Sequence, residues 1–421
     1  MLASICSPTC KYSLILGKIT RPMTDKIVSP SRDVVAPYAW VILGVVYLAS
    51  IIAPLNQFKI PPIMPVLIDV FGLDLTQAGL LMSIIAVVGL FLALPAGILL
   101  QRFGARALGV FALGCMALGS AIGAMAGVYP TLLGSRLIEG IGIGLVGVVA
   151  PATIAMWFPP ARQGIPMGIW ATWMPVGSVL VYNMAPLVAN TLGWRAVWWV
   201  GVGSALVIML LYGLFIRSPE WQQPAKHSSQ SSFGSGKALA NRDIWLLGLA
   251  FACFNLALVS IGTYYPTFLS EVRGYSLGGA AFISSLSSLI VIIGAPLAGL
   301  VSDRIGSRRL MFSLPFLFIA LMLFLPFRVT GWQIPTLMVV QGLVVGAIPT
   351  ATFAAAPEVM RRPEWAGLGL AVILLGQNLG NLIGPVLFGE LVSNLGWLTA
   401  GYLMIPVSLI GFVSAWMVRV R

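Results

Sequence analysis

Charged residues and histidine are scarce in this sequence. Only 9% of its 421 residues are charged and one is histidine, His227, whereas 59% are hydrophobic. A soluble globular protein carries about 25% charged residues, so this chain cannot cover itself with a polar surface. A cytosolic enzyme, a secreted domain and a disordered chain are therefore disfavoured, and a membrane protein with several spans is predicted.

Cysteine is also rare, and no pattern indicates a metal or a cofactor. The four cysteines do not make a disulfide framework, and Cys115 and Cys253 sit within apolar runs. One histidine without a Cys/His cluster disfavours zinc motifs. The glycines from Gly140 to Gly144 lie inside an apolar run with no strand before them and no Walker lysine, so a nucleotide loop is not indicated. We expect neither metal nor cofactor.

Long apolar runs fill most of the chain. A helix needs about 20 apolar residues to cross a bilayer, and twelve such runs can be counted. They are 38–66, 77–100, 107–127, 129–156, 164–189, 196–216, 244–269, 279–302, 310–327, 333–357, 366–390 and 398–418. The fold class predicted is an all-α membrane protein with twelve transmembrane helices.

A polar segment divides the runs into six and six. Residues 217–243 are rich in Ser, Gly and Gln, as a flexible linker is. Residues 1–37 are mostly polar and lack the apolar core of a signal peptide; Met23 is an alternative start. The predicted organisation is a tail (1–37), a bundle (38–216), a linker (217–243) and a second bundle (244–421).

The positive charges give an orientation. Most of the 24 Lys and Arg residues fall in the tail, the linker and alternate loops, whereas only Arg195, Arg273 and Arg328 fall in the loops of the other side. Loops rich in Lys and Arg stay in the cytoplasm. Both termini and the linker are therefore predicted to be cytoplasmic, in a bacterial-type inner membrane. Charges scattered in this way do not form a nucleic-acid-binding patch.

The two halves repeat each other. GILLQRFGAR at 97–106 and GLVSDRIGSR at 299–308 share four residues at an offset of 202. At that offset Glu139-Gly140 aligns with Gln341-Gly342, and at 203 Leu192-Gly193-Trp194 aligns with Leu395-Gly396-Trp397. Two parallel bundles with a cavity between them are implied. The third, sixth, ninth and twelfth runs lack charged, amide and His side chains, so these helices are predicted to be peripheral.

These motifs resemble those of the major facilitator superfamily. The copy at 299–308 matches its motif A, whereas the first copy has Gln101 where an Asp is expected, and SRLIEGIGIGL at 135–145 resembles the stretch of its fourth helix. NQFKIPPIMPVL (56–67) and KALANRDIWLLGLAF (237–251) resemble the bacterial branch of cyanate and nitrate/nitrite porters. The resemblance implies two six-helix bundles and solute transport by alternating access.

The loop motifs are interpreted as a gate. Asp303 would pair with an arginine or cap a helix while the inner side is closed, and would lose that partner on opening. The alternative is that these charges only set the topology. The predicted gate residues are Gly97, Gln101, Arg102, Gly104, Arg106, Gly299, Asp303, Arg304, Gly306 and Arg308.

Lys59 lies inside the first run, three residues after Asn56, on the same stripe of a helix. A central lysine costs about 2.5–3.5 kcal/mol on insertion scales and needs a wet or paired environment. It either anchors an anionic solute in the cavity or lies near the outer end and reaches water. Pro61, Pro62 and Pro65 remove main-chain donors, so a bent helix is predicted whose freed carbonyls face the cavity.

Arg136 and Glu139 stand three residues apart in the fourth run, so their side chains can meet. They form either a structural ion pair or a pair linked to protonation, because burial favours the neutral carboxyl and a nearby arginine favours the charged one. Glu139 is the predicted proton-coupling residue, since Glu358 and Glu390 lie near helix ends.

Neutral polar side chains complete the predicted solute-binding set. Amides both donate and accept hydrogen bonds, so they suit a small polar solute. The alternative is hydrogen bonding between helices, worth about 0.6 kcal/mol each on average. The set comprises Asn56, Lys59, Arg136, Tyr182, Asn183, Asn255, Tyr264, Tyr265, Gln341, Gln377, Asn378 and Asn381. Trp170 and Trp173 either wall the cavity or pack against other aromatic side chains.

The predicted function is secondary active transport of a small polar solute, with a proton as co-substrate and the protein as a monomer. The solute is predicted to be an anion because Lys59 and Arg136 outnumber the one deep carboxylate. The alternatives are a drug/proton antiporter with a greasy pocket and a membrane sensor without transport. A membrane enzyme is disfavoured because no dense set of acids, His or Cys gathers at one interface.

Overall fold

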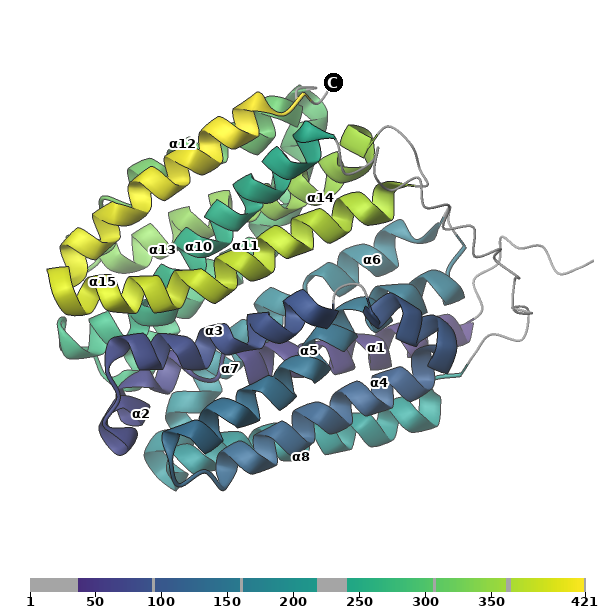
Figure 1. Ribbon diagram of the computed structural model, residues 1–421, viewed down its shortest axis with the longest axis horizontal. Helices are drawn as coiled ribbons and strands as arrows, with labels where there is room; N and C mark the ends of the chain where they lie inside the picture. Colours follow the sequence, from purple (N-terminus) through teal and green to yellow (C-terminus); the bar gives the residue numbers. More distant parts are fainter. Residues whose placement is uncertain are drawn as a thin grey trace, which may run out of the picture. The chain divides into compact units, whose positions relative to one another are not determined.

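The computed structural model describes residues 37–92, 95–159, 162–217, 241–305, 308–360 and 365–419. All regular secondary structure in these ranges is helical (Figure 1). The predicted tail, the linker apart from its ends, and Gly306 of the second loop motif lie outside the described residues.

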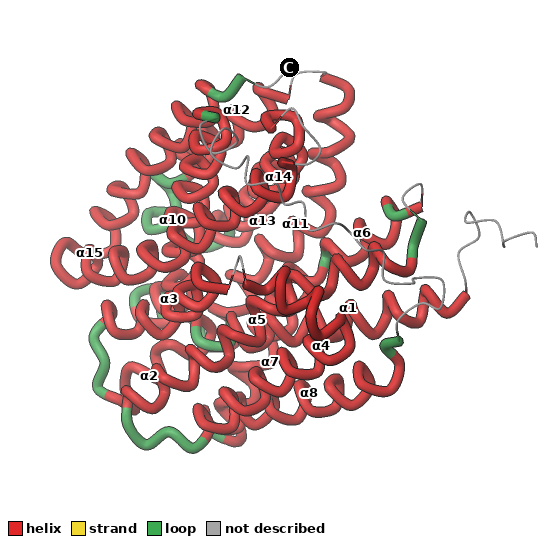
Figure 2. The backbone as a smooth tube through the Cα atoms, turned by 45° about the vertical axis from the view of Figure 1, so that its right-hand side comes forward, coloured by secondary structure: helices red, strands yellow, loops and turns green. Residues whose placement is uncertain are grey.

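Helices α1 to α8 form the first bundle and α10 to α15 the second (Figures 1 and 2). The first consists of α1 (Pro37–Gln57), η1 (Pro61–Ile63), α2 (Met64–Phe71), α3 (Leu75–Leu92), α4 (Pro95–Ala124), α5 (Tyr129–Trp157), α6 (Gly164–Ala171), α7 (Trp173–Leu192) and α8 (Trp194–Phe215). The second consists of α10 (Arg242–Glu271), α11 (Leu277–Ile305), α12 (Arg308–Met322), α13 (Gln333–Val345), α14 (Ala347–Met360) and α15 (Ala366–Met417).

The prolines break the first predicted span as expected. α1 ends at Gln57, a turn follows, and Pro61 and Pro62 open the short helix η1. A proline cannot donate to the carbonyl four residues earlier, so the regular helix cannot continue through this segment. α3 and α4 cover the second predicted run as far as it is described, and α4 continues through the predicted loop with a kink at Gly104.

Ten helical stretches of the described residues are long and apolar enough to cross a membrane. The described part of each of the twelve predicted runs is mostly helical, but the number of crossings stays a prediction. The last two runs both lie within α15, which is kinked at Gly396 where the backbone is not helical, and α12 contributes a shorter apolar helix, Phe312–Met322.

Gly193 and Gly396 confirm the repeat at the level of backbone conformation. Gly193 has φ 84° and ψ 161°, and Gly396 has φ 78° and ψ 166°. This region is essentially restricted to glycine. Two glycines that align in sequence therefore turn the chain in the same way at the same place in each half.

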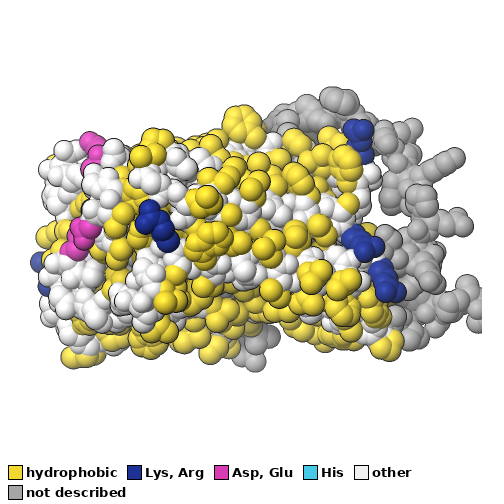
Figure 3. Space-filling model, turned by 90° about the horizontal axis from the view of Figure 1, so that it is seen from below, with side chains coloured by type: hydrophobic (Ala, Val, Ile, Leu, Met, Phe, Trp, Pro, Cys, Tyr) yellow, Lys and Arg dark blue, Asp and Glu magenta, His cyan; other side chains and the backbone are white. Residues whose placement is uncertain are grey.

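The helices predicted to be peripheral carry much of the exposed apolar surface. On α8, Val207 and Leu210 are 59% and 64% exposed, and on α12, Leu321 is 61% exposed. Figure 3 shows a broad belt of hydrophobic side chains, with most charged side chains towards its two ends. Such a belt is stable against lipid and would be unstable against water.

Side-chain hydrogen bonds join the two bundles near the end opposite the linker. The Tyr264 hydroxyl on α10 lies 2.5 Å from the carbonyl oxygen of Leu75 on α3 and 3.0 Å from that of Pro385 on α15. Thr76 donates to Glu390 at 2.8 Å. We call this contact zone of α3, α10 and α15 the far seam; η1 also lies beside α10.

Candidate functional site

A cluster of polar side chains lies at the broken end of α1, inside the first bundle. Asn56 lies in the last turn of α1, Lys59 lies in the turn that follows, Ser120 comes from α4, and Arg136 and Glu139 come from α5. All five side chains are buried, with at most 1% exposed. We call these five residues the charge network.

Arg136 caps the end of α1. Its Nη1 donates to the Asn56 carbonyl at 2.7 Å and its Nη2 to the Gln57 carbonyl at 2.9 Å, while Nε donates to Leu81 on α3 at 3.2 Å. The last carbonyls of a helix have no partner within it, and Pro61 cannot supply a donor to Gln57. The freed carbonyl that the sequence places towards a cavity therefore binds an arginine instead.

Glu139 receives hydrogen bonds on both carboxylate oxygens. Its Oε2 pairs with Nη1 of Arg136, so the predicted contact between these two residues is confirmed. Its Oε1 accepts from Lys59 Nζ at 2.5 Å and from Ser120 Oγ at 2.6 Å. Lys59 Nζ also donates to Ser120 Oγ at 2.9 Å and to Asn56 Oδ1 at 3.2 Å.

Helix α8 closes the network from one side. The Lys59 ammonium lies 4.7 Å from the centre of the Trp198 ring, which is favourable for a cation over an aromatic face. Gly201 makes room for the network, because a Cβ at this position would lie 2.8 Å from Asn56 Oδ1 and 3.0 Å from Ser120 Oγ. A larger side chain at Gly201 would displace these polar groups.

The charge network holds two cations and one carboxylate. Lys59 pairs with Glu139 through one carboxylate oxygen and Arg136 through the other, so the formal balance is one positive charge in excess. A buried charge without a full partner is costly, and an additional negative charge would be stabilised at this position. The cluster therefore combines one buried carboxylate with two cationic hydrogen-bond donors.

The structure excludes one of the two alternatives drawn for Lys59 from the sequence. Its side chain is 1% exposed, so the hypothesis that it reaches water is wrong for this structure. It faces Glu139 rather than an open cavity, and its role in solute binding stays a prediction that requires the network to open. Sequence reasoning missed Ser120, Trp198 and Gly201, which lie on helices predicted to be peripheral; the small residues around Ser120 were the only signal.

The predicted amides do not gather at one point. Asn255 and Asn378 each donate to the carbonyl four residues earlier on their own helix. Asn183 is exposed and donates across the bundles to Ser285 at 3.2 Å. Gln377 and Asn381 share one half-buried face of α15, and Asn381 Oδ1 is buried without a hydrogen-bond partner among the described residues.

The predicted tyrosines make contacts between helices. Tyr182 donates to the Gly262 carbonyl across the bundles at 3.2 Å, and Tyr264 bridges the far seam. Tyr265 donates to the Pro326 carbonyl within the second bundle at 3.3 Å. The rings of Trp170 and Trp173 stack with centres 5.9 Å apart. A role of any of these side chains in binding stays a prediction.

The gate motifs are described only in the first half. Gln101, Arg102 and Arg106 lie on α4 with exposed side chains, and Gly104 has φ 76°. Gly299, Asp303 and Arg304 lie on α11 and Arg308 begins α12, but their side chains lie outside the described part of the structure. The pairing predicted for Asp303 therefore stays a prediction.

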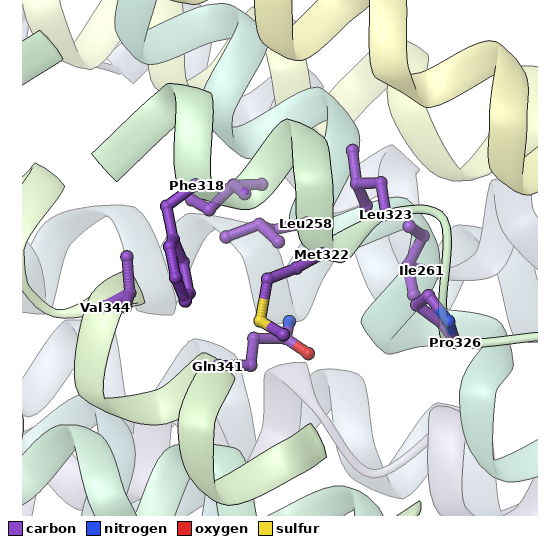
Figure 4. Close-up of a pocket in the computed structure, with 9 residues that line it drawn as sticks. Leu258, Ile261, Phe318, Met322, Leu323, Pro326, Gln341 and Val344 are labelled. Carbon is purple, nitrogen blue, oxygen red and sulfur yellow. The ribbon is translucent and has the colours of Figure 1, made fainter. Parts of the chain in front are cut away.

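Gln341 lies in a small apolar pocket inside the second bundle (Figure 4). In Figure 4 its amide lies beside Met322 and faces a space bordered by aliphatic side chains. The pocket is formed by α10, α12 and α13 together with Pro326 of the loop between α12 and α13. Its lining residues are Leu258, Ile261, Phe318, Ile319, Met322, Leu323, Pro326, Gln341 and Val344. No three His, Cys, Asp or Glu side chains gather as a metal site anywhere in the described ranges.

Comparison with known proteins identifies the fold. A family model described as Major Facilitator Superfamily matches residues 46–361 and 278–421. The crystal structure of a D-xylose-proton symporter superposes with a TM-score of 0.73 at 19% identity, over 90% of this chain and 98% of that one. This likeness concerns the fold alone.

Several curated proteins are similar in sequence. A probable sulfoacetate transporter of Cupriavidus necator is 25% identical over 63% of this chain, which spans 65% of that relative's length. An MFS-type efflux pump of Mycolicibacterium smegmatis is 24% identical over 91% of this chain and 93% of its own. A probable nitrate/nitrite antiporter of Thermus thermophilus is 24% identical over 58% of this chain and 56% of its own. The resemblance to the nitrate-type branch therefore has only weak support.

Proposed function

Because this chain belongs to the major facilitator superfamily, we propose that it is a secondary transporter that moves a small anionic solute across the cytoplasmic membrane by alternating access, coupled to protons. The proposal places both termini in the cytoplasm and treats the protein as a monomer. The observation that carries it is the charge network, in which Lys59 and Arg136 share the single carboxylate of Glu139.

The far seam supports alternating access. Hydrogen bonds and close packing join the bundles at this end, through Tyr264, Thr76 and Glu390. Glu390 is exposed, and an exposed hydrogen bond of this kind contributes little net stability. This exposed part of the seam can therefore break without a large penalty, which a carrier needs in order to open to that side. The loop motifs around Gln101 and Asp303 would form the corresponding gate at the linker end.

The excess positive charge supports an anionic solute and explains how a proton is coupled to it. When Glu139 is ionised, it neutralises one of the two cations. When a proton neutralises Glu139, Lys59 and Arg136 both lack a counter-charge, and an anion that enters can supply it. Proton and anion thus bind more favourably together than separately, which is the requirement for symport. Gln377 and Asn381, with its unpartnered Oδ1, are the side chains of the second bundle that we assign to the solute.

Relatives that carry anions agree with this charge. Sulfoacetate and nitrate are the solutes named for two of the similar proteins. The second candidate is export of hydrophobic compounds. The observation that favours it is the similarity to the efflux pump, which covers more of this chain than the similarity to either anion transporter. The two candidates differ in the direction of transport and in the charge of the solute.

The test is uptake into liposomes that contain the purified protein. Radiolabelled sulfoacetate and nitrate are supplied outside at pH 6, with the interior at pH 7.5, and accumulation is compared with that at equal pH. We expect accumulation driven by the proton gradient, weakened in Lys59→Gln and uncoupled from the gradient in Glu139→Gln. Gln333→Asn, at an exposed position at the start of α13, is the matched control for reconstitution.

The efflux candidate is tested in the same liposomes with a lipophilic cationic dye. Dye movement driven by the gradient, together with no anion accumulation, would overturn the proposal. Accumulation that persists unchanged in folded Glu139→Gln would exclude Glu139 as the proton-coupling residue, and the anion would then need another energy source.

A further inference from the structure

The pocket around Gln341 is the repeat-related counterpart of the charge network. The offset of 202 residues that aligns the loop motifs also carries each network position into the second half. Asn56 corresponds to Leu258, Lys59 to Ile261, Ser120 to Met322, Arg136 to Met338 and Glu139 to Gln341. Four of these five counterparts, all except Met338, line the same pocket. Sequence repeat and three-dimensional packing therefore identify the same place in each bundle.

The helices around the two places correspond as well. The network is held between the end of α1, α4 and α5, and the pocket is held between α10, α12 and α13. Met338, the counterpart of Arg136, is buried at 4% exposure. Every charged residue of the first site is thus replaced by a neutral one in the second, and a single amide, Gln341, stands where the first half has a carboxylate.

From this asymmetry we infer that the transport cycle uses one proton, which Glu139 binds and releases, and that the second half contributes no titratable group at the equivalent position. The inference deepens the proposed proton coupling and rests on it. A carrier with a carboxylate at both places would bind two protons. With one, a solute of charge −1 moves without net charge, and a solute of charge −2 moves with one net negative charge.

The charged and polar groups that face Glu139 come from several of the helices packed around it. The end of α1 brings Lys59 and Asn56, α4 brings Ser120, and α5 brings Arg136. Arg136 is bonded to a carbonyl of α3, and α8 adds the Trp198 ring over Lys59. Arginine keeps its charge in proteins, so the groups of the network that can bind or release a proton are the Glu139 carboxylate and the Lys59 amine. Loss of the Glu139 charge removes both ion pairs and changes the relative stability of the conformations.

The test measures, in the absence of solute, how steeply a conformational change of the protein depends on pH, which gives the number of protons involved. Ser285 is 3% exposed and bonded to Asn183 across the bundles, so a cysteine there reports opening of the contact between them. Ser285→Cys, in a chain without its four native cysteines, is labelled with a maleimide in nanodiscs between pH 5 and 8. A cysteine at Val128, which is 58% exposed, gives the intrinsic pH dependence of thiol labelling, and the rates are divided by it.

We expect the corrected rate to follow a one-proton titration, changing by at most about tenfold per pH unit. Glu139→Gln should make it flat, and Gln341→Leu should leave its steepness unchanged. A steeper, two-proton dependence, a titration that survives in Glu139→Gln, or a flat response with Glu139 intact would each overturn the inference. The steepness is measured with the network unchanged, so it does not depend on whether Glu139→Gln folds.

The solute-based assay is independent of this outcome. Anion accumulation together with a two-proton or flat labelling response would support the proposed transport and contradict the single-proton site. A one-proton titration without anion accumulation would support the single-proton site and contradict the proposed transport. Adding a carboxylate in Gln341→Glu gives a further check, because a second titrating group should then steepen or split the labelling curve.

Discussion

Removing the Glu139 carboxylate should destabilise the protein more than removing the Lys59 ammonium. The reason is the charge balance of the network, in which two buried cations share one carboxylate. Glu139→Gln keeps the shape of the side chain and leaves both cations without a counter-charge. Removing one partner of a buried ion pair costs about 3–5 kcal/mol, and here a single change breaks two pairs.

Lys59→Met leaves a balanced pair. Arg136 and Glu139 remain in contact, and the excess charge disappears together with its desolvation penalty. The losses are the ion pair of Nζ with Glu139 and its hydrogen bonds to Ser120 and Asn56, and hydrogen bonds to a charged group are worth about 1.5–3 kcal/mol each. The desolvation penalty that disappears is also several kcal/mol, so the gain offsets the losses and Lys59→Met should lower the free energy of unfolding far less than Glu139→Gln does.

The double variant gives the sharpest form of the prediction. Lys59→Met combined with Glu139→Gln leaves one buried cation, Arg136, which is still held by three main-chain carbonyls. The single variant Glu139→Gln leaves two. Adding Lys59→Met to Glu139→Gln should therefore raise stability by more than Lys59→Met alone changes it in the wild type, which independent effects of the two substitutions cannot do.

The assay is heat treatment of the purified variants in one detergent, followed by gel filtration to measure the folded fraction. We expect apparent melting temperatures in the order of wild type close to Lys59→Met, then the double variant, then Glu139→Gln. If Lys59→Met melts below Glu139→Gln, or if the double variant melts below both single ones, the argument from charge balance is wrong.

Three further outcomes follow from the packing. Gly201→Ala should lower the melting temperature because its Cβ presses on the charge network, whereas Gly203→Ala, which meets nothing within 4 Å, should not. Tyr264→Phe removes the hydroxyl that bridges the bundles and should speed maleimide labelling of a cysteine placed at the far seam by up to about tenfold. Tyr265→Phe should not, because the Tyr265 hydroxyl is hydrogen-bonded within one bundle. Gly396→Ala should cost about 1–3 kcal/mol from backbone strain alone, measurable as reduced heat resistance, and no loss would contradict the assigned conformation.

The sequence predicts those features that depend on local spacing. Apolar runs locate the helices because a helix that faces lipid must be apolar along its whole length. The interval of three residues brings Arg136 and Glu139 together on one face, and Pro61 and Pro62 end the regular part of the first span. The sequence aligns Gly193 with Gly396 as part of a repeat, and the two glycines have the same backbone conformation in the structure.

Contacts between distant helices escaped the same reasoning. Lys59 meets Glu139 across 80 positions and Ser120 across 61, and nothing in the local pattern selects these partners. A pattern assigns a polar side chain to one face of a helix, but the neighbour that the face meets depends on the packing of the whole bundle. For this reason the amides at Asn255 and Asn378, predicted to bind solute, bond largely to their own helices.

The comparison of the two halves separates what the fold needs from what the function needs. The second bundle builds the same helix crossing with Leu258, Ile261 and Met322, and its packing requires no charge at this place. Replacing a buried ion pair by apolar groups of similar size is often neutral or even stabilising, so the charge network is not explained by stability. The second copy of the repeat thus serves as a reference for the first. The two copies differ in the buried carboxylate between Lys59 and Arg136, and we therefore assign the proposed proton coupling to that carboxylate.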